Sequence, residues 1–400
     1  MTKIQTRLRS RVFITALGIV AAASLPAAYA APTTAQRVCI NKANGAALVK
    51  SECTTLELTF SEQSYSVGRD RIVHVGTKGA KYKSVTAALI AVQRLRPSAT
   101  SPVVVRIGPG TFTLSDPTII PSDVTVEGAG REATTLNTSP THGLLLESNT
   151  TLRKITVKGA LNVDAGAVIN KPQAGGSVTL EDLGVTVSGT FWNQRAIYLT
   201  DATSTIRNVR ITGPANSAGG CGIELSQGSA TIENSTIDLA GITTGISINN
   251  AGDVTVRNTT INLNTLRSGE QATGILVGGI TTKLFVDGLK LKADGSLGQI
   301  STGVYVSGSV GEALIVNSSL DTIGATAGTV EAGDGGAAQV LNSRLTASGT
   351  NPPVGAVGAS TVKVAGTLLS GGAPFLDSGG TVTCAGVYDE NFAFSASSCP

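Results

Sequence analysis

The chain has 400 residues, including 48 Gly and 14 Pro, while charged residues make up only 14% and aromatic residues 4%. Collagen, which needs glycine at every third position, and disordered chains, which lack hydrophobic residues, are both excluded by a sequence that is 41% hydrophobic and has no triplet period. This composition is typical of many short strands joined by tight turns.

The first thirty residues have the pattern of a secretory signal peptide. An apolar stretch spans residues 12–25, and Ala28-Tyr29-Ala30 provides a cleavage site before Ala31. The basic residues that precede the apolar stretch are Lys3, Arg7, Arg9 and Arg11. We therefore expect an exported protein of the extracellular space, the cell surface or the periplasm. No later apolar run reaches the roughly 18 residues that a membrane span needs.

The net charge argues against nucleic acid as a partner. The whole chain carries 30 Lys and Arg against 27 Asp and Glu, a formal charge of +3. Residues 1–30 hold four of the basic residues and no acidic ones, so the remainder has 26 positive and 27 negative charges. A nearly neutral chain lacks the basic surface that binding to nucleic acid or to acidic membranes requires.

Five cysteines remain after the predicted cleavage. In an oxidising compartment we expect two local disulfides, Cys39–Cys53 near the start and Cys384–Cys399 at the end. Cys221 lies in an apolar strand pattern with no histidine nearby in sequence, so we interpret it as a buried structural thiol.

A strand pattern of the type small-Gly-aliphatic-x-aliphatic recurs with a mean spacing of about 27 residues, and a second apolar-alternating strand follows each copy. The first aliphatic residues of the copies are Leu144, Val168, Ile197, Ile223, Ile246, Ile275, Val304, Val330 and, more weakly, Val357. Such repeats share one core by stacking. Period-two alternation and scarce helix formers exclude a helical repeat, and the sequence predicts a right-handed, single-stranded parallel β-helix.

Asparagine and aspartate recur inside the second strands, where we expect a structural ladder. Both residue types tolerate left-handed backbone geometry, so stacked copies would form an internal polar ladder at one corner. The ladder positions are Asp182, Asn208, Asn234, Asn258, Asp287, Asn317 and Asn342. The residues one place earlier are charged in several copies (Glu181, Arg207, Glu233 and Arg257) and should stack as an exposed row of ion pairs.

The expected domains follow from this repeat. Residues 1–30 are the signal peptide, 31–70 a small lead segment, 71–380 the β-helix and 381–400 a C-terminal cap. An amphipathic segment from Ser84 to Leu95, with Ser84 as N-cap and Pro97 beyond its end, should be a helix that covers the N-terminal edge.

The segments KYKSVTAALIAV, VVVRIGPGTFTL and IIPSDVTVEGAGREATTL resemble the opening of pectinesterase-like and pectin-lyase-like β-helix proteins over about Val73–Leu136. The resemblance implies the same fold and, by extension, an esterase, hydrolase or lyase that acts on a polysaccharide. The catalytic motifs of pectinesterases, pectate lyases and polygalacturonases are missing, apart from the pair His142-Gly143. Function must therefore come from a site of this chain.

The sequence offers few catalytic candidates. His74 and His142 are its two histidines, and neither has a nearby nucleophile or metal-ligand spacing. Carboxylates are the remaining acid or base supply and could meet across coils at the roughly 5–9 Å that glycosidases use. We assign no catalytic residue, no cofactor and no metal, and calcium dependence is left open.

The residue between the paired aliphatic residues of each first strand should point outward. Read along the stack, these residues are Leu145, Ile169, Tyr198, Glu224, Ser247, Leu276, Tyr305 and Glu331. An exposed strip with this apolar and aromatic content must be covered by a loop or another subunit, or bind something. The candidate ligand-binding residues are Trp192, Arg195, Tyr198, Glu224 and Tyr305, because aromatic faces beside an arginine can receive a sugar ring or a carboxylate.

We favour an exported, non-enzymatic β-helix protein that binds a polysaccharide or another cell-surface component. The alternatives are a pectinesterase-like or lyase-like carbohydrate-active enzyme and a structural spacer or adhesin element. The missing catalytic motifs, set against the pectinesterase-like opening, separate the first two hypotheses. The ligand and the oligomeric state are left open.

Overall fold

The computed structural model describes residues 71–400 except 165, 190–192, 214–219, 242–243, 265–270, 280–282, 309–310 and 349–350. Before residue 71 it describes only three strands, and there, as at residues 296–299, only their backbone. The chain divides into two compact units, Met1–Gly68 and Arg69–Pro400. The predicted signal peptide and Cys53, with the predicted Cys39–Cys53 disulfide, lie outside the described residues.

The first unit contains a small antiparallel sheet within the predicted lead segment. Its order is β2-β1-β3, with β1 (Arg37–Asn41) paired to both neighbours. Strand β2 spans Ala47–Lys50 and β3 spans Glu57–Phe60.

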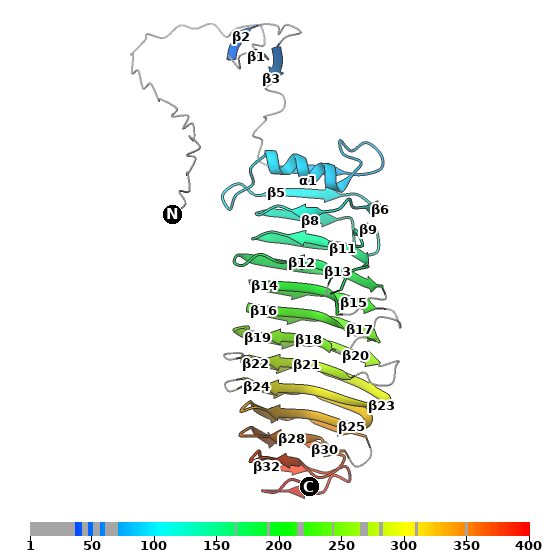
Figure 1. Ribbon diagram of the computed structural model, residues 1–400, viewed down its shortest axis with the longest axis vertical. Coiled ribbons are helices and arrows are strands. Elements are labelled where there is room, and N and C mark those ends of the chain that lie inside the picture. Colours follow the sequence, from blue (N-terminus) through cyan, green and yellow to red (C-terminus); the bar gives the residue numbers. More distant parts are fainter. Residues whose placement is uncertain are drawn as a thin grey trace, which may run out of the picture. The chain divides into compact units, whose positions relative to one another are not determined.

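The second unit is a stack of coils, each built from up to three strands that pair in parallel with the same strands of the next coil (Figure 1). We call the three resulting faces the A, B and C sheets. Several strands are long enough to turn a corner and contribute to two sheets. This arrangement confirms the predicted fold class, an all-β right-handed parallel β-helix with an N-terminal capping helix.

The A sheet is formed by the strands that carry the first repeat motif. They are β7 (Thr118–Ile120), β10 (Leu144–Leu146), β12 (Ala167–Lys171), the first parts of β14 (Gln194–Arg207) and β16 (Gly220–Glu233), β18 (Thr244–Asn249), β21 (Ala272–Gly278), the last parts of β23 (Lys290–Ser307) and β25 (Ser319–Gly333), β28 (Val354–Val357) and β31 (Phe375–Asp377).

The B sheet follows the A sheet within each coil and starts nearest the capping helix. It contains β4 (Ile72–Val75), β5 (Val103–Ile107), β8 (Val124–Gly128), the first parts of β11 (Thr150–Ala160) and β13 (Ser177–Ser188), the last parts of β14 and β16, β19 (Asp253–Arg257), β22 (Lys283–Asp287), β24 (Glu312–Val316), β26 (Ala337–Leu341), β29 (Thr361–Ala365) and β32 (Thr381–Ala385).

The C sheet completes each coil. It contains β6 (Gly110–Thr113), β9 (Thr134–Asn137), the last parts of β11 and β13, β15 (Arg210–Gly213), β17 (Thr236–Ala240), β20 (Thr260–Asn264), the first parts of β23 and β25, β27 (Arg344–Ala347), β30 (Leu368–Ser370) and β33 (Val387–Tyr388). Strand β34 (Phe394–Ser395) pairs with β33 in the antiparallel sense.

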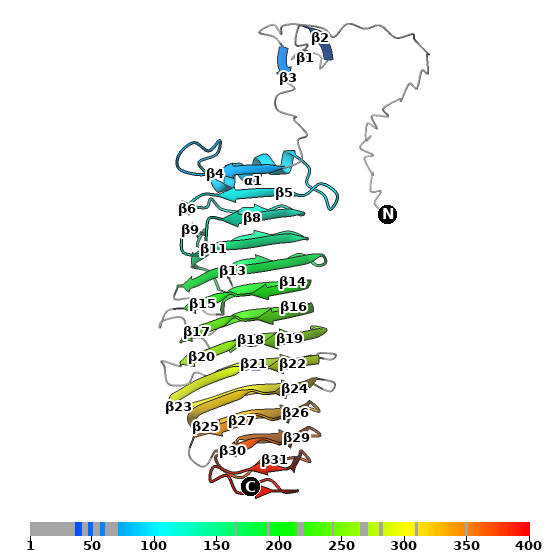
Figure 2. The same ribbon diagram turned by 180° about the vertical axis from the view of Figure 1, so that it is seen from behind.

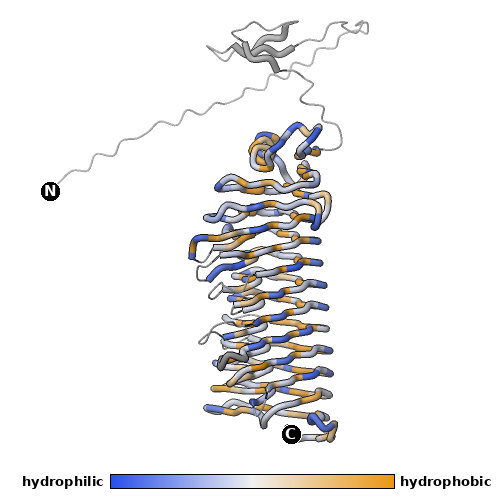
Figure 3. Tube along the Cα trace, turned by 90° about the vertical axis from the view of Figure 1, so that its right-hand side faces the viewer, coloured by the Kyte–Doolittle hydropathy of each residue, from blue (hydrophilic) through white to orange (hydrophobic). Residues whose placement is uncertain are grey.

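The alternation of apolar and polar residues along the strands builds a single core inside the coils. Figure 3 shows this alternation as the change between orange and blue along each coil. Aliphatic residues that point inward stack on their equivalents in the next coil: Ile197, Ile223, Ile246 and Ile275 are each 0% exposed. The core runs continuously from Val75 to Val387.

The predicted register holds at most coils and needs two corrections. Leu144 and Ile197 both pair with Ile169, so the equivalent position is Ile169 and not the predicted Val168. Likewise Val330 pairs with Val354 and not with Val357. In both places consecutive small or aliphatic residues fit the motif equally well, so spacing alone cannot decide which of them points inward.

The capping helix has the predicted bounds. Helix α1 spans Val85–Arg94, and the N-cap Ser84 accepts a hydrogen bond from the Ala87 backbone N–H at 3.3 Å. One face of α1 is buried through Val85, Ala88, Leu89 and Val92. The helix contacts β4, β5 and β7, so it covers the N-terminal edge of the stack (Figure 2).

At the other end of the stack, the β-helix continues past residue 380. Strand β32 stacks on β29 in register, and the Cys384–Cys399 disulfide ties the final residues to it. Leu376 occupies an inward position of β31, in line with Ala356, but is 54% exposed because no coil lies beyond it. The C-terminal segment is therefore partly a last coil and only partly a cap.

The corner between the B and C sheets is a left-handed turn. One residue at this corner has φ between 46° and 69° in each of ten coils. These residues are Lys154, Asp182, Asn208, Asn234, Asn258, Gly288, Asn317, Asn342, Gly366 and Gly386. Six of the seven predicted ladder residues lie here. The seventh, Asp287, lies one residue earlier, where its backbone is in register with Arg257. Gly288 has the left-handed conformation in this coil.

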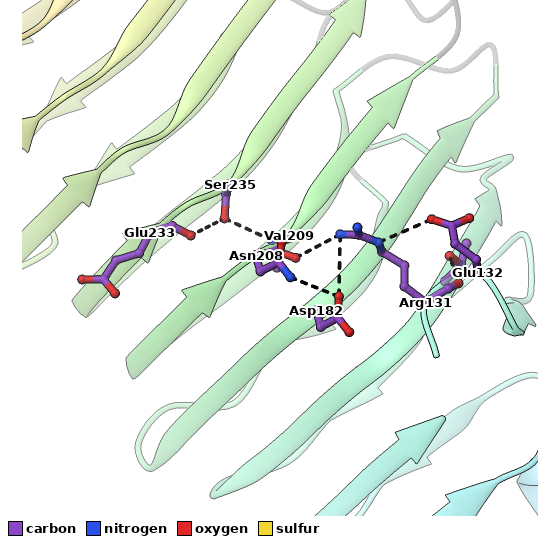
Figure 4. A network of polar contacts seen from close by, with 8 residues as sticks. Arg131, Glu132, Asp182, Asn208, Val209, Glu233 and Ser235 are labelled. Atoms are coloured by element: carbon purple, nitrogen blue, oxygen red, sulfur yellow. Dashed lines mark hydrogen bonds and ion pairs between the residues drawn. The ribbon is translucent and has the colours of Figure 1, made fainter. Parts of the chain in front are cut away.

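The corner asparagines do not form the internal ladder that was expected, because their side chains are exposed. The internal polar ladder lies one residue later, in buried hydroxyls. Ser235 donates to the Glu233 carbonyl at 2.9 Å and accepts from the Val209 N–H at 3.2 Å (Figure 4). The other buried hydroxyl residues of this ladder are Thr259, Ser318, Ser343 and Thr367.

Arg131 ties three coils together near this corner. Its Nη1 lies 3.8 Å from Asp182 Oδ1 and donates to the Asn208 carbonyl at 3.3 Å, while its Nε lies 3.5 Å from Glu132 (Figure 4). Asn208 Nδ2 in turn donates to Asp182 Oδ1 at 3.1 Å. The arginine therefore reaches from the segment after β8 to the end of β14, which sequence spacing did not indicate.

Candidate functional site

The outward residues of the A sheet form a straight column, as the repeat predicts. Parallel pairing places one residue of this column on each coil, with about 4.8 Å between neighbours. The column is Ile119, Leu145, Asn170, Tyr198, Glu224, Ser247, Leu276, Tyr305, Glu331, Gly355 and Phe375. The predicted Ile169 is 0% exposed, and Asn170 takes its place because the register shifts by one residue.

Arg195, Tyr198 and Glu224 form one polar cluster on this column. The Arg195 guanidinium forms an ion pair with Glu224 and lies 5.0 Å from the centroid of the Tyr198 ring. Asn249 from β18 donates to Glu224 Oε1 at 3.4 Å. Three of the five predicted binding residues therefore lie together, because consecutive coils bring positions about 26 residues apart into contact.

The neighbouring Cys221 is 5% exposed and lies beside Arg195 in the register. Burial raises the pKa of its thiol, and the nearby Glu224 carboxylate adds to this effect. A thiol that stays protonated is a poor nucleophile. The structural interpretation of Cys221 agrees with this environment.

Trp192 lies outside the described residues, together with Phe191. The described part of the structure therefore neither brings Trp192 to Arg195 nor separates the two. Several segments outside the described residues come just before strands of the A sheet in the sequence. Among them, 214–219 and 242–243 directly precede β16 and β18, and 190–192 and 265–270 are each separated by one residue from β14 and β21.

Tyr305 and Glu331 form a second cluster four coils further along the column. They are direct neighbours in the register of β23 and β25. Burial raises the pKa of the Glu331 carboxyl. Burial also raises the pKa of the Tyr305 phenol, and the charges of Asp334 and Glu331 raise it further. Both groups therefore keep their protons to a higher pH than they ordinarily would.

Glycines make room for both side chains. A Cβ atom on Gly328 would lie 1.7 Å from Glu331 Oε1, and one on Gly333 would lie 2.5 Å from Tyr305 Oη. The two polar ends therefore occupy space that any other residue at these positions would fill. The sequence placed Glu331 in the strip but did not reveal these gaps: Gly328 lies three residues before Glu331 on the same strand, and Gly333 lies one coil from Tyr305.

The sequence assigned no catalytic role to His142 and no metal site. His142 Nδ1 lies 2.8 Å from Asp116 Oδ1, one coil away, a pair that the sequence did not reveal. Desolvation acts to raise the pKa of Asp116, but hydrogen bonds from His142, Ser139 and Thr141 outweigh it and lower the pKa. Within the described residues, no group of three or more His, Cys, Asp or Glu side chains is arranged to hold a metal ion.

The B sheet carries the row of charges expected from sequence. Arg207 lies 2.7 Å from Glu181, and Arg257 lies 3.4 Å from Glu233. The row extends toward the N-terminal edge, where Glu127 pairs with Arg153 at 3.2 Å. These pairs are partly exposed, and such pairs contribute little to stability.

A hollow of about 510 Å³ on the B sheet was not expected. Phe285 and Leu314 are register neighbours in its floor, and the Arg257 guanidinium lies 5.6 Å from the centroid of the Phe285 ring. Charged side chains of alternating sign, Asp253, Lys283 and Glu312, line its edge. It is one alternative to the A-sheet column as a binding surface.

No protein-family model matches the chain, and comparison with curated protein sequences finds no match. Solved structures with a similar course of the chain have low identity. A mannuronan C-5 epimerase A-module of Azotobacter vinelandii is 16% identical, with 76% of this chain and 94% of that chain covered and a TM-score of 0.47. A GH87 α-1,3-glucanase of Streptomyces thermodiastaticus is 16% identical, with 78% of this chain and 67% of that chain covered and a TM-score of 0.45.

The third comparison is pectin methylesterase from carrot, which is 13% identical, with 65% of this chain and 82% of that chain covered and a TM-score of 0.39. The described part of the present chain contains no helix long and apolar enough to cross a membrane.

Proposed function

We propose that this protein is exported and binds an extended polysaccharide along the A sheet without transforming it. The observation that carries the proposal is the outward column, in which Tyr198, Leu276, Tyr305 and Phe375 are interspersed with polar residues along the stack. A rigid row of aromatic and hydrogen-bonding groups, one position on each coil, matches a ligand that is itself an extended repeat.

The neighbourhood of the column supports binding more than catalysis. Glu224 is engaged by Arg195 and Asn249, and Arg195 also lies against the Tyr198 ring. This mutual pairing fixes the side chains without leaving a nucleophile or base poised for reaction. Export is supported by the Cys384–Cys399 disulfide, since disulfides persist mainly in oxidising compartments.

The test is affinity gel electrophoresis of residues 31–400 on a panel of neutral and acidic polysaccharides. Retention should fall about tenfold for Tyr198→Ala and again for Tyr305→Ala, because buried aromatic contacts dominate such interfaces. The matched control is Phe285→Ala, which removes an aromatic residue from the B sheet and should leave retention unchanged.

Three results would contradict the proposal. Loss of retention in Phe285→Ala but not in the tyrosine variants would move the site to the B-sheet hollow. Soluble oligosaccharides, methanol or acetate released during incubation would show an enzyme, the pectinesterase-like or lyase-like alternative. No retention on any polysaccharide would favour a structural spacer or adhesin element.

A further inference from the structure

The A sheet is poor in positive charge. Among its outward positions in the described residues, Arg195 is the one basic side chain, and Glu224 neutralises it. The acidic residues on the same face include Glu331 and, at the end of β31, Asp377. A polymer of uronic acids would therefore meet a surface without a surplus of cations, and like charges across an interface oppose binding.

Glu331 is the central polar group in the C-terminal half of the column. Its Oε1 lies over Gly328, and its Cγ lies 3.5 Å from the place where a Cβ of Gly355 would be. The Phe375 side chain approaches the same Gly355 position to 3.7 Å. The carboxyl group is thus held between two glycine gaps, with an aromatic ring next to it that is 49% exposed.

No hydrogen bond or ion pair to the Glu331 carboxyl exists among the described residues, although burial disfavours its charged form. Burial without a nearby cation favours the protonated carboxyl, and the O–H of this form can donate a hydrogen bond to a ligand. Tyr305, its register neighbour one coil away, presents a second O–H group further along the strand, at Gly333.

We propose that Glu331, Tyr305 and Phe375 form a subsite for an uncharged sugar unit, so that the A sheet takes a neutral polysaccharide and not a polyuronate. The inference rests on the proposed function. The ring of Phe375 provides an apolar face for the sugar, and the O–H groups of Glu331 and Tyr305 donate to its oxygens from opposite sides, at Gly328 and at Gly333.

Binding in this subsite depends on pH through Glu331. The groups that face it are Tyr305 from β23 and Asp334 at the end of its own strand, while β28 contributes no titratable side chain and β31 contributes Asp377. The raised pKa of Glu331 comes from burial, and neither aspartate adds to it. Affinity is full below the pKa of Glu331 and falls about tenfold per pH unit above it when only the acid form binds.

The experiment measures retention of residues 31–400 in gels that contain either a neutral glucan or polygalacturonate, from pH 4 to pH 8. Wild type should be retained by the neutral polymer, with retention that falls as pH rises. Glu331→Gln keeps a neutral donor, so it should be retained equally at all pH values. Glu331→Ala should bind about tenfold more weakly at pH 4, and Glu312→Gln, on the B sheet, should behave as wild type.

The outcomes separate this inference from the proposed function. Retention by polygalacturonate but not by the neutral glucan would overturn the neutral subsite and leave polysaccharide binding intact. Retention on the glucan with the same pH profile in wild type and Glu331→Gln would overturn the role of Glu331 alone. Failure of retention on both polymers and on the wider panel would overturn the two proposals together.

Discussion

Lys171 is a basic residue buried in the apolar core of the β-helix. It occupies an inward position of β12, in register with Leu199, and is 0% exposed. Its ammonium donates to the Gln173 carbonyl. Burial lowers the pKa of Lys171, and the charge of Asp201 opposes this effect only in part. A charged group in the core costs more free energy than an apolar residue of similar size.

Replacing this lysine should therefore stabilise the protein. We expect Lys171→Met to raise the free energy of unfolding at pH 7 by about 1 kcal/mol, since buried charges are often replaced at a gain. The folded state holds the Lys171 proton less tightly than the unfolded state does. Wild-type stability should therefore rise as pH approaches the pKa of free lysine, and the advantage of the variant should shrink.

Thermal unfolding of both proteins at pH 7 and pH 10 measures this effect. Lys158→Met replaces an exposed lysine on β11 and serves as the control, with no change expected at either pH. A Lys171→Met variant that is less stable than wild type at pH 7 would show that the buried ammonium contributes favourably.

At the scale of the element, the corner between the B and C sheets depends on backbone conformation. Asn234 has φ of 50°, and its N–H bonds to the Arg257 carbonyl of the next coil at 3.1 Å. Residues with a Cβ atom are strained in the left-handed region, asparagine less than most and glycine not at all. In nine of the ten coils the corner therefore carries Asn, Asp or Gly, Lys154 being the exception, and where Ser or Thr follows, its hydroxyl makes the internal hydrogen bonds.

Two substitutions at Asn234 should therefore differ in their effect on stability. Asn234→Ala should lower the free energy of unfolding by about 1 kcal/mol because of backbone strain, whereas Asn234→Gly should be nearly neutral. Denaturant unfolding followed by circular dichroism measures both. Asn264→Ala, at the exposed end of β20, is the control and should have little effect. Equal losses for Ala and Gly would show that the asparagine side chain matters more than its backbone.

At the scale of the whole molecule, the two ends of the stack are closed differently. Helix α1 covers the first coil with a buried apolar face, whereas the last coil relies on β34 and the Cys384–Cys399 bond. Exposed aromatic and aliphatic side chains remain at this end, among them Leu376, Phe392 and Phe394. Because coils of a solenoid contact only their neighbours, loss of one end need not unfold the rest.

The disulfide should therefore control local stability at the C-terminal end. Cys399→Ser opens a loop of 15 residues, and a loop of that length is worth about 3 kcal/mol of unfolding free energy. Hydrogen exchange should speed up in residues 381–400 and stay unchanged in α1. Adding a reductant to wild type should reproduce the effect, and equal acceleration throughout the stack would contradict local opening.

Local sequence patterns were enough to predict the repeat, the fold class, the capping helix and the outward column on which Tyr198, Glu224 and Tyr305 lie. Each of these follows from local pattern: period-two alternation, a capped amphipathic segment, and a spacing near 27 residues. The assignment failed by one residue at Val168 and Asp287 and by three at Val357, where neighbouring residues match the motif equally well. Only the stacking of coils chooses among them.

Tertiary structure alone decided which side chains act together. The ion pair of Arg195 with Glu224 joins residues 29 positions apart, and Arg131 reaches a carbonyl 77 positions away. The gap that Gly333 leaves for Tyr305 is likewise created by register between coils, whereas Gly328 lies on the same strand as Glu331. Strand periodicity records whether a residue points in or out, but not what the next coil places beside it. The chemistry of this surface is therefore a property of the stack.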